Sequence, residues 1–182
     1  MNGQELFETE LLPHADALYN FAYHLTYNEE DANDLVQEAY LKAYKYIYNY
    51  QAGTNGKAWL FRILKNTFIN DYRKSSKLPN TIDYQELVDV HMEDEIVSSH
   101  QYDLRDDIFN GTMGDEISTA LNSLPIDFKT VILLCDIEGF SYEEISKILE
   151  IPIGTVRSRL HRARNILKEK LHAYAESMGY KS

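Results

Sequence analysis

The sequence predicts an all-α protein of two small helical domains joined by an acidic linker. Apolar residues recur at spacings of three and four in both flanking parts of the chain, with almost no alternation by two, which is the helical period. The net charge of −11 over 182 residues is concentrated in the middle, where residues 75–116 hold 2 basic and 11 acidic side chains. We therefore expect domains at 1–74 and 115–182, with a flexible linker over 75–114.

The first domain is expected to hold three helices, at about 4–27, 31–48 and 58–74, with a glycine-containing loop before the third. The second of these has an apolar stripe that predicts its buried face: Ala32, Leu35, Val36, Ala39, Ala43, Tyr46 and Ile47. Its other face is polar but includes one leucine: Asp34, Gln37, Glu38, Leu41 and Lys45. This face is compatible with plain solvated surface and with a protein-docking surface.

The third helix carries a predicted cationic face with an aromatic border, formed by Trp59, Arg62, Lys65, Asn66, Asn70 and Arg73. Cations attract phosphates, and flat or polar groups accept unstacked bases, so the pattern is typical of single-strand binding. The simpler interpretation is that the aromatic residues here are core. We expect this for Phe61 and Phe68, which point away from the basic face.

The last domain is expected to hold helices at about 115–124, 126–138, 142–149 and 154–175. Ser141 and Glu144 have the spacing of a capping box, which marks the start of the third of these helices. That helix is short and is separated from the long final helix by a break at Glu150-Ile151-Pro152. A short helix, a tight turn and a longer helix form the helix-turn-helix pattern.

The final helix predicts a buried stripe and an opposite basic face. The stripe consists of Val156, Leu160, Ala163 and Leu167. The candidate DNA-contacting residues are Thr155, Arg157, Ser158, His161, Arg162 and Asn165, with Arg159 and Arg164 on the flanks. Arginine can bind guanine bidentately, and serine and asparagine can contact bases or phosphates. A solvated basic surface is the alternative, but the capped helix and the turn favour DNA binding.

Several other functions are disfavoured by the sequence. We find no nucleophile with a positioned base, no phosphate-binding glycine loop and no histidine–acid metal site, so we expect no enzyme activity, cofactor or metal. His161 lacks a partner at ligand spacing, and the single cysteine, Cys135, is expected to be an inert core thiol. The chain has no apolar run long enough for membrane insertion and an acidic N-terminus unlike a leader, so we expect a cytoplasmic protein.

Two sets of motifs resemble one protein family. Leu124-Pro125, Tyr142-Glu143-Glu144-Ile145 and residues 154–164 (GTVRSRLHRAR) resemble the C-terminal promoter-binding domain of bacterial sigma factors of the extracytoplasmic-function (ECF) group. Residues 31–44 (DANDLVQEAYLKAY) and 58–67 (AWLFRILKNT) look like the polymerase-binding and promoter-melting regions of the same family. The two matches occur in the family's order and cover nearly all of the chain except the linker.

The resemblance implies a factor that docks on core RNA polymerase, reads minus-35 promoter DNA through the helix-turn-helix and melts the minus-10 element through the N-terminal domain. It implies that the polar face containing Leu41 grips clamp helices of the polymerase. It also implies that Asn66 and the 50–57 loop receive a base flipped out of the minus-10 element. An anti-sigma partner is implied in the same way.

The sequence departs from the family pattern at two places. Glu150 stands where the family often has glycine, and loop 51–56 lacks the usual short glycine–acid–serine form, which leaves the preferred minus-10 sequence open. Two other functions stay open on the residues alone. One is an autonomous repressor or activator that binds its operator unaided, and the other is a helical interaction scaffold without a nucleic-acid function.

Overall fold

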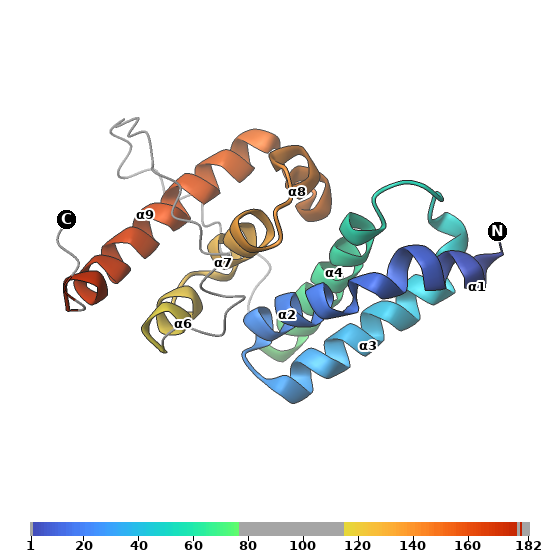
Figure 1. The fold of residues 1–182 in the computed structure, drawn as a ribbon, viewed down its shortest axis with the longest axis horizontal. Coiled ribbons are helices and arrows are strands. Elements are labelled where there is room, and N and C mark those ends of the chain that lie inside the picture. The colour runs from blue at the N-terminus through green and yellow to red at the C-terminus, as the bar shows by residue number, and fades with distance from the viewer. Residues whose placement is uncertain (1, 77–114, 178, 180–182) are drawn as a thin grey trace.

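A computed structural model of the chain describes residues 2–76, 115–177 and 179. All regular elements in these ranges are helical (Figure 1), which confirms the all-α prediction. They are α1 Gly3–Leu6, the π-helical turn η1 Phe7–Leu11, the 3₁₀ turn η2 Leu12–His14, α2 Ala15–Thr26, α3 Glu29–Lys45, the 3₁₀ turn η3 Ile47–Asn49, α4 Gly56–Ser76, α6 Asp115–Asn122, α7 Ile126–Ile132, the π-helical turn η4 Leu133–Ile137, α8 Tyr142–Leu149 and α9 Ile153–Ser177. The predicted linker falls almost entirely outside the described residues.

Helices α2, α3 and α4 pack together into an N-terminal body, with α1 and η1 along one end (Figure 1). The single helix predicted over 4–27 is wrong in one respect, because the chain passes through η2 before α2 begins. Pro13 explains the interruption, since it has no amide hydrogen to continue the helical ladder. Helix α3 begins where the Asn28 side chain accepts the Asp31 amide at 3.0 Å.

The predicted apolar stripe of α3 is buried except at Val36 and Tyr46. The fully buried members are Ala32, Leu35, Ala39, Ala43 and Ile47, whereas Val36 is half-buried. The prediction for Tyr46 was wrong, because its side chain is 48% exposed. The helix ends at Lys45, and the Tyr46 backbone turns away from helical geometry (φ −105°, ψ 20°), so its side chain leaves the stripe.

Helices α6 to α9 form a C-terminal body in which α8 and α9 make the predicted helix-turn-helix. The Ser141 hydroxyl accepts the Glu144 amide at 3.2 Å, and the Glu144 carboxylate accepts the Ser141 amide at 2.8 Å. This reciprocal capping starts α8 at the predicted residue. The helix ends at Leu149, and Glu150 caps it in a left-handed backbone conformation (φ 56°, ψ 44°) that costs a non-glycine residue on the order of 1 kcal/mol.

Helix α9 buries the stripe that the sequence predicted. Val156, Leu160, Ala163 and Leu167 are each at most 4% exposed. They pack in the core of the C-terminal body, where α9 contacts α6, α7 and α8. Because successive residues turn by about 100°, burial of this stripe fixes which side chains of α9 face solvent.

The two bodies pack against each other along α4 and α8, with a smaller contact between α2 and α7 (Figure 1). Phe61 of α4 lies at the centre of this junction. Its ring centroid is 4.9 Å from that of Phe21 in α2 and 5.1 Å from that of Phe140, which precedes α8. The expected core placement of Phe61 is confirmed, and Phe68 is half-buried.

The burial of His24 leads us to predict that the free energy of unfolding depends on pH. Burial, with a contribution from the Lys129 ammonium, lowers the pKa of His24 below its ordinary value of 6.5, and its Nδ1 is buried without a hydrogen-bond partner. The unfolded chain therefore takes up a proton more readily than the folded chain as the pH falls through 6.5. We expect the free energy of unfolding to be highest above that pH and to decrease below it.

Urea denaturation of the wild type and His24→Leu at pH 7.5 and pH 5.5 checks this expectation. The substitution should reduce the loss of stability between the two pH values. His172→Gln is the control, because His172 is exposed on α9. Equal pH dependence in wild type and His24→Leu would contradict the assignment to His24.

Candidate nucleic-acid interface

The predicted basic face of α9 is partly exposed to solvent. Arg157, Ser158, His161 and Asn165 are exposed, and Thr155, Arg159, Arg162 and Arg164 are half-buried. The His161 ring nitrogen Nε2 lies 3.3 Å from the Asn165 amide nitrogen, one turn along the helix. The Ser158 hydroxyl donates to the Thr155 carbonyl at 3.1 Å. The exposed N-terminal half of α9 therefore offers donors of the kinds that read base edges.

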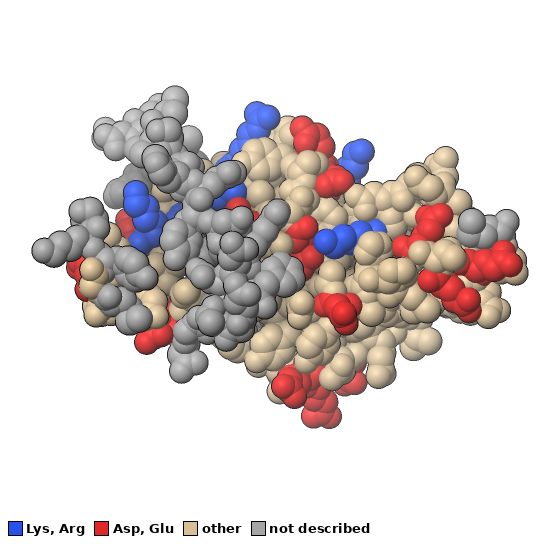
Figure 2. Space-filling view, viewed as in Figure 1, with Lys and Arg blue, Asp and Glu red and all other residues tan. Residues whose placement is uncertain are grey.

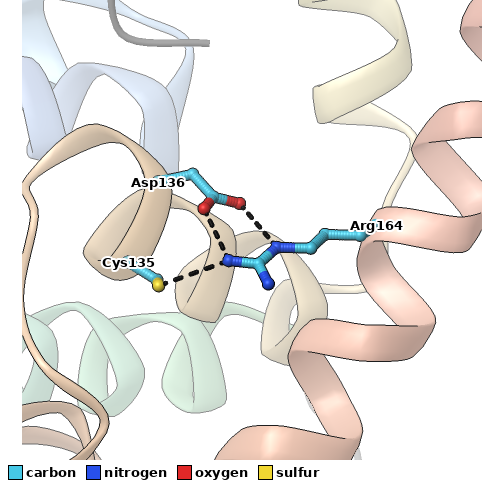
Figure 3. Close-up of polar contacts among 3 residues, drawn as sticks. All are labelled: Cys135, Asp136 and Arg164. Carbon is cyan, nitrogen blue, oxygen red and sulfur yellow. Dashed lines mark hydrogen bonds and ion pairs between the residues drawn. The ribbon is translucent and has the colours of Figure 1, made fainter. Parts of the chain in front are cut away.

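Two of the predicted arginines have partners inside the C-terminal body. Arg164 donates from Nε to Oδ2 of Asp136 at 3.1 Å and from Nη2 to Oδ1 at 2.7 Å, a two-pronged ion pair shown in Figure 3. Hydrogen bonding to Asp136 raises the pKa of Arg164 above its already high ordinary value. Arg159 lies 3.7 Å from Asp127. Contact of either arginine with DNA stays a prediction. The two-pronged pair of Arg164 with Asp136, called the fork below, connects α9 to η4.

Cys135 lies beside this ion pair. Its sulfur is 3.5 Å from Nη2 of Arg164 (Figure 3), and the side chain is half-buried against the core. The sequence placed this thiol within the core and did not predict the arginine beside it.

The cationic face of α4 also lies at the surface, at the junction with the C-terminal body. Arg62, Asn70 and Arg73 are exposed, and Trp59, Lys65 and Asn66 are half-buried. Burial lowers the pKa of Lys65; nearby Arg62 and Arg73 lower it further, while Glu150 opposes them. The Trp59 ring lies 5.1 Å from the Tyr50 ring, so an aromatic pair borders the cations.

A single carboxylate organises the loop before α4. The Glu10 carboxylate lies 2.6 Å from the Tyr50 hydroxyl and accepts the Gly53 amide at 3.1 Å. A Cβ at Gly56 would lie 2.9 Å from the Glu10 carbonyl oxygen, so only glycine fits there. Nothing in the sequence identified Glu10, because it lies some 40 residues before its partners.

The polar face of α3 is exposed as predicted. Asp34, Gln37, Leu41 and Lys45 are exposed, and the half-buried Glu38 pairs with Lys42 at 2.8 Å. Leu41 is 72% exposed, which is unusual for a large apolar side chain. Tyr44, one turn further along α3, is 53% exposed, and Tyr48 in η3 is 91% exposed. Aromatic side chains are enriched in protein interfaces, which favours the docking interpretation of this face.

The described residues contain no group of three His, Cys, Asp or Glu side chains placed to hold a metal ion. Within the same ranges, no helix combines the length and the apolar character that a membrane span requires.

Comparison with known proteins assigns the chain to a family. Residues 12–78 match Sigma-70 region 2, and residues 114–167 match Sigma-70, region 4. The chain is 33% identical to the ECF RNA polymerase sigma factor EcfG of Rhodopseudomonas palustris, with 90% of this chain and 83% of that protein covered. The chain belongs to the ECF group of the sigma-70 family. As an ECF sigma factor it is a transcription initiation factor rather than an enzyme, and it directs core RNA polymerase to promoters.

Two further relatives are also ECF sigma factors. The ECF sigma factor SigW of Bacillus subtilis is 31% identical, with 92% of this chain and 90% of SigW covered. SigE of Mycolicibacterium smegmatis is 39% identical over 158 residues, which are 87% of this chain but only 58% of SigE.

Solved structures show the same fold. The sigma factor RpoE, determined in complex with the anti-sigma factor NepR from Bartonella quintana, superimposes with a TM-score of 0.68 at 35% identity, covering 91% of this chain and 96% of that one. CnrH, determined with the cytosolic domain of CnrY, gives a TM-score of 0.63 at 23% identity, which supports the fold alone.

The fork between Arg164 and Asp136 predicts a difference between neighbouring arginines of α9. Arg164→Ala should lower the free energy of unfolding by about 1.5–3 kcal/mol, because it leaves a partly buried carboxylate without its charged donor. Chemical denaturation of the purified chain measures this loss.

Arg157→Ala is the matched control, since Arg157 is exposed on the same helix, and we expect its stability to stay within about 0.5 kcal/mol of wild type. Arg164→Lys keeps the charge but not the fork, and should recover only part of the loss. Equal stability of Arg164→Ala and Arg157→Ala would contradict a structural role for the fork.

Proposed function

We propose that this ECF sigma factor inserts α9 into the major groove of the minus-35 element, binds and melts the minus-10 element with α4 and the 50–57 loop, and docks core polymerase through α3. The observation that carries the proposal is the register of α9. Its apolar stripe is fully buried, so Arg157, Ser158 and His161 project from the N-terminal half of the second helix of a helix-turn-helix. That half of the helix is the part that contacts base edges in this motif.

The minus-10 role is supported by the chemistry of α4 and its loop. Arg62 and Arg73 supply positive charge, Trp59 and Tyr50 supply an aromatic border, and Asn66 is half-buried beside them. A base removed from the duplex loses stacking worth a few kcal/mol, so a pocket with polar and aromatic walls is needed to receive it. Glu10 fixes the loop through its contacts with Tyr50 and Gly53, beside the residues proposed to receive the base.

We further propose that the functional units are residues 1–74 and 115–182, with 75–114 as an acidic linker, and that the protein acts in the cytoplasm. An anti-sigma factor is a proposed partner, by similarity to the RpoE structure solved with NepR.

A gel-shift assay with promoter DNA, with and without core polymerase at stated salt, separates this function from its rivals. The proposal expects weak binding by the free chain and specific binding with polymerase. Tight, specific binding without polymerase would favour an autonomous regulator. No promoter complex with or without polymerase would favour an interaction scaffold.

Arg157→Ala is predicted to weaken binding to the minus-35 element by about 1–3 kcal/mol and to relax the preference at one base pair. The reason is that an exposed arginine at this position can bind a guanine edge bidentately. Competition binding of the polymerase complex to single-base promoter variants measures both effects. Lys170→Ala removes an exposed charge from the distal part of α9 and should retain the base preference. An unaltered preference in Arg157→Ala would contradict base reading by this residue.

Leu41→Ala is predicted to weaken association with core polymerase by roughly 1–2 kcal/mol, about tenfold, while the stability of the free chain is unchanged. The side chain is 72% exposed in the free chain, so its burial would occur only in the complex. Titration with labelled core enzyme measures the affinity. Leu12→Ala is the control, because Leu12 is an exposed leucine on η2 rather than on the α3 face. Equal affinities of the two variants would contradict docking through Leu41.

A further inference from the structure

The contact between the two bodies has a consistent polarity. Three donors of the N-terminal body face three glutamates of the C-terminal body. Asn55 donates from Nδ2 to Glu144 at 2.7 Å, and the Lys57 ammonium lies 3.1 Å from the Glu138 carboxylate and donates to the Glu138 carbonyl at 3.3 Å. The third contact is an ion pair between Arg62 and Glu150. Figure 2 shows basic and acidic side chains next to each other where the two bodies meet.

Aromatic packing supports the same junction. The Lys57 ammonium lies 5.6 Å from the Phe61 ring centroid and 5.1 Å from that of Phe140, so one cation lies against a ring from each body. Phe61 and Phe140 are both buried, at 0% and 6% exposed. Separation of the bodies would bring part of these rings into water, so the junction has an apolar component besides the glutamates.

This junction covers one end of the surface to which the proposed function assigns minus-10 DNA, whereas Asn70 and Arg73 of that surface stay exposed. Asn55 belongs to the loop before α4, Lys57 to the first turn of α4, and Arg62 to the cationic face itself. A carboxylate paired with Arg62 occupies the guanidinium that a phosphate or a base would need. Glu150 also lies close enough to Lys65 to influence its protonation. The C-terminal body therefore presents anions to the groups that would bind the anionic strand.

If α9 and α4 bind the two promoter elements as proposed, the chain cannot keep this junction on a promoter. Positions −35 and −10 differ by 25 base pairs, which is about 85 Å of straight duplex at 3.4 Å per pair. In the structure, α8 of the helix-turn-helix lies directly on α4. The 38 residues between Ser76 and Asp115 can span at most roughly 130 Å, so the chain is long enough to let the bodies separate.

Glu150 is the least constrained of the three glutamates and the most strained in its backbone. Glu144 also caps α8, and the Glu138 side chain is only 5% exposed. The Glu150 side chain is 54% exposed, yet its backbone adopts the left-handed conformation that favours glycine. A glutamate at this turn therefore carries backbone strain that glycine would avoid. Its side chain contacts Arg62 across the junction.

We propose that the pair Arg62–Glu150 is a latch that holds the free sigma factor closed, with the C-terminal body masking the end of the minus-10 surface that contains Arg62. The inference rests on the proposed function of α4. Both side chains of the pair are about half exposed, and such pairs are weak, so a partner that binds the open chain can release the latch. Core polymerase, docked on α3 and holding the bodies apart on DNA, is the partner that this arrangement fits.

The test uses the full chain with Glu150→Lys, which places two cations opposite each other, and Glu143→Lys as the matched control. Glu143 is an exposed glutamate in the first turn of α8, the helix that Glu150 caps, so the control has the same change of charge. Small-angle scattering measures the radius of gyration. Quenching of Trp59, the single tryptophan, measures binding of a minus-10 single-stranded oligonucleotide directly at the masked surface.

We expect Glu150→Lys to have a larger radius of gyration than wild type and at least about fivefold tighter oligonucleotide binding, because affinity scales with the open fraction. Glu143→Lys should remain compact and bind less tightly than Glu150→Lys. The charge swap Arg62→Glu with Glu150→Lys should restore the wild-type radius. With core polymerase bound, wild type and Glu150→Lys should bind the oligonucleotide equally, since the latch is already released.

The same measurements separate failure of the latch from failure of the proposed function. A radius of gyration that does not differ between Glu150→Lys and Glu143→Lys overturns the latch. An expanded chain that binds the oligonucleotide no better than the control overturns the masking. Either result leaves the proposed function standing, whereas a wild-type chain that forms no promoter complex with core polymerase overturns the proposed function itself.

Discussion

The burial of one apolar stripe on α9 is the constraint on which the organisation of the C-terminal body depends. Val156, Leu160 and Ala163 have almost no exposed surface, and a helix that buries one face has no freedom in what it presents on the other. The Arg164–Asp136 fork adds a polar fixture on the flank, which ties α9 to η4. Together these contacts set the rotation of the helix about its axis, and the rotation decides which donors can meet DNA.

The distribution of charge along the chain matters more for DNA binding than the net charge does. A net charge of −11 would oppose binding to a polyanion, yet the surfaces of α9 and α4 that are proposed to meet DNA are locally basic. Some of the acidic residues act within the fold: Glu10 shapes the loop before α4, Asp136 fixes α9, and Glu144 both caps α8 and contacts Asn55. These acidic groups therefore help to position the basic surfaces, besides lowering the net charge.

Local signals were sufficient to predict much of this architecture. The bounds of α8 were predicted to the residue, because the Ser141–Glu144 capping box is a short-range signal, and the stripe of α9 followed from periodicity. Tyr46 was misplaced because periodicity cannot show where a helix stops. The roles of Glu10 and Asp136, and the glutamates facing α4, involve partners 28 to 89 positions away along the chain. No pattern within one helix contains that information, so only the folded chain reveals it.

The fork of Arg164 has a consequence for how this sigma factor can evolve. Because the tilt and rotation of α9 are held by internal contacts, Arg157, Ser158 and His161 can be exchanged without disturbing the scaffold beneath them. A duplicated copy of the gene could thus acquire a new promoter preference through a few surface substitutions while its fold is inherited unchanged. New regulons would then arise by substitution of DNA-contacting side chains on an unchanged fold.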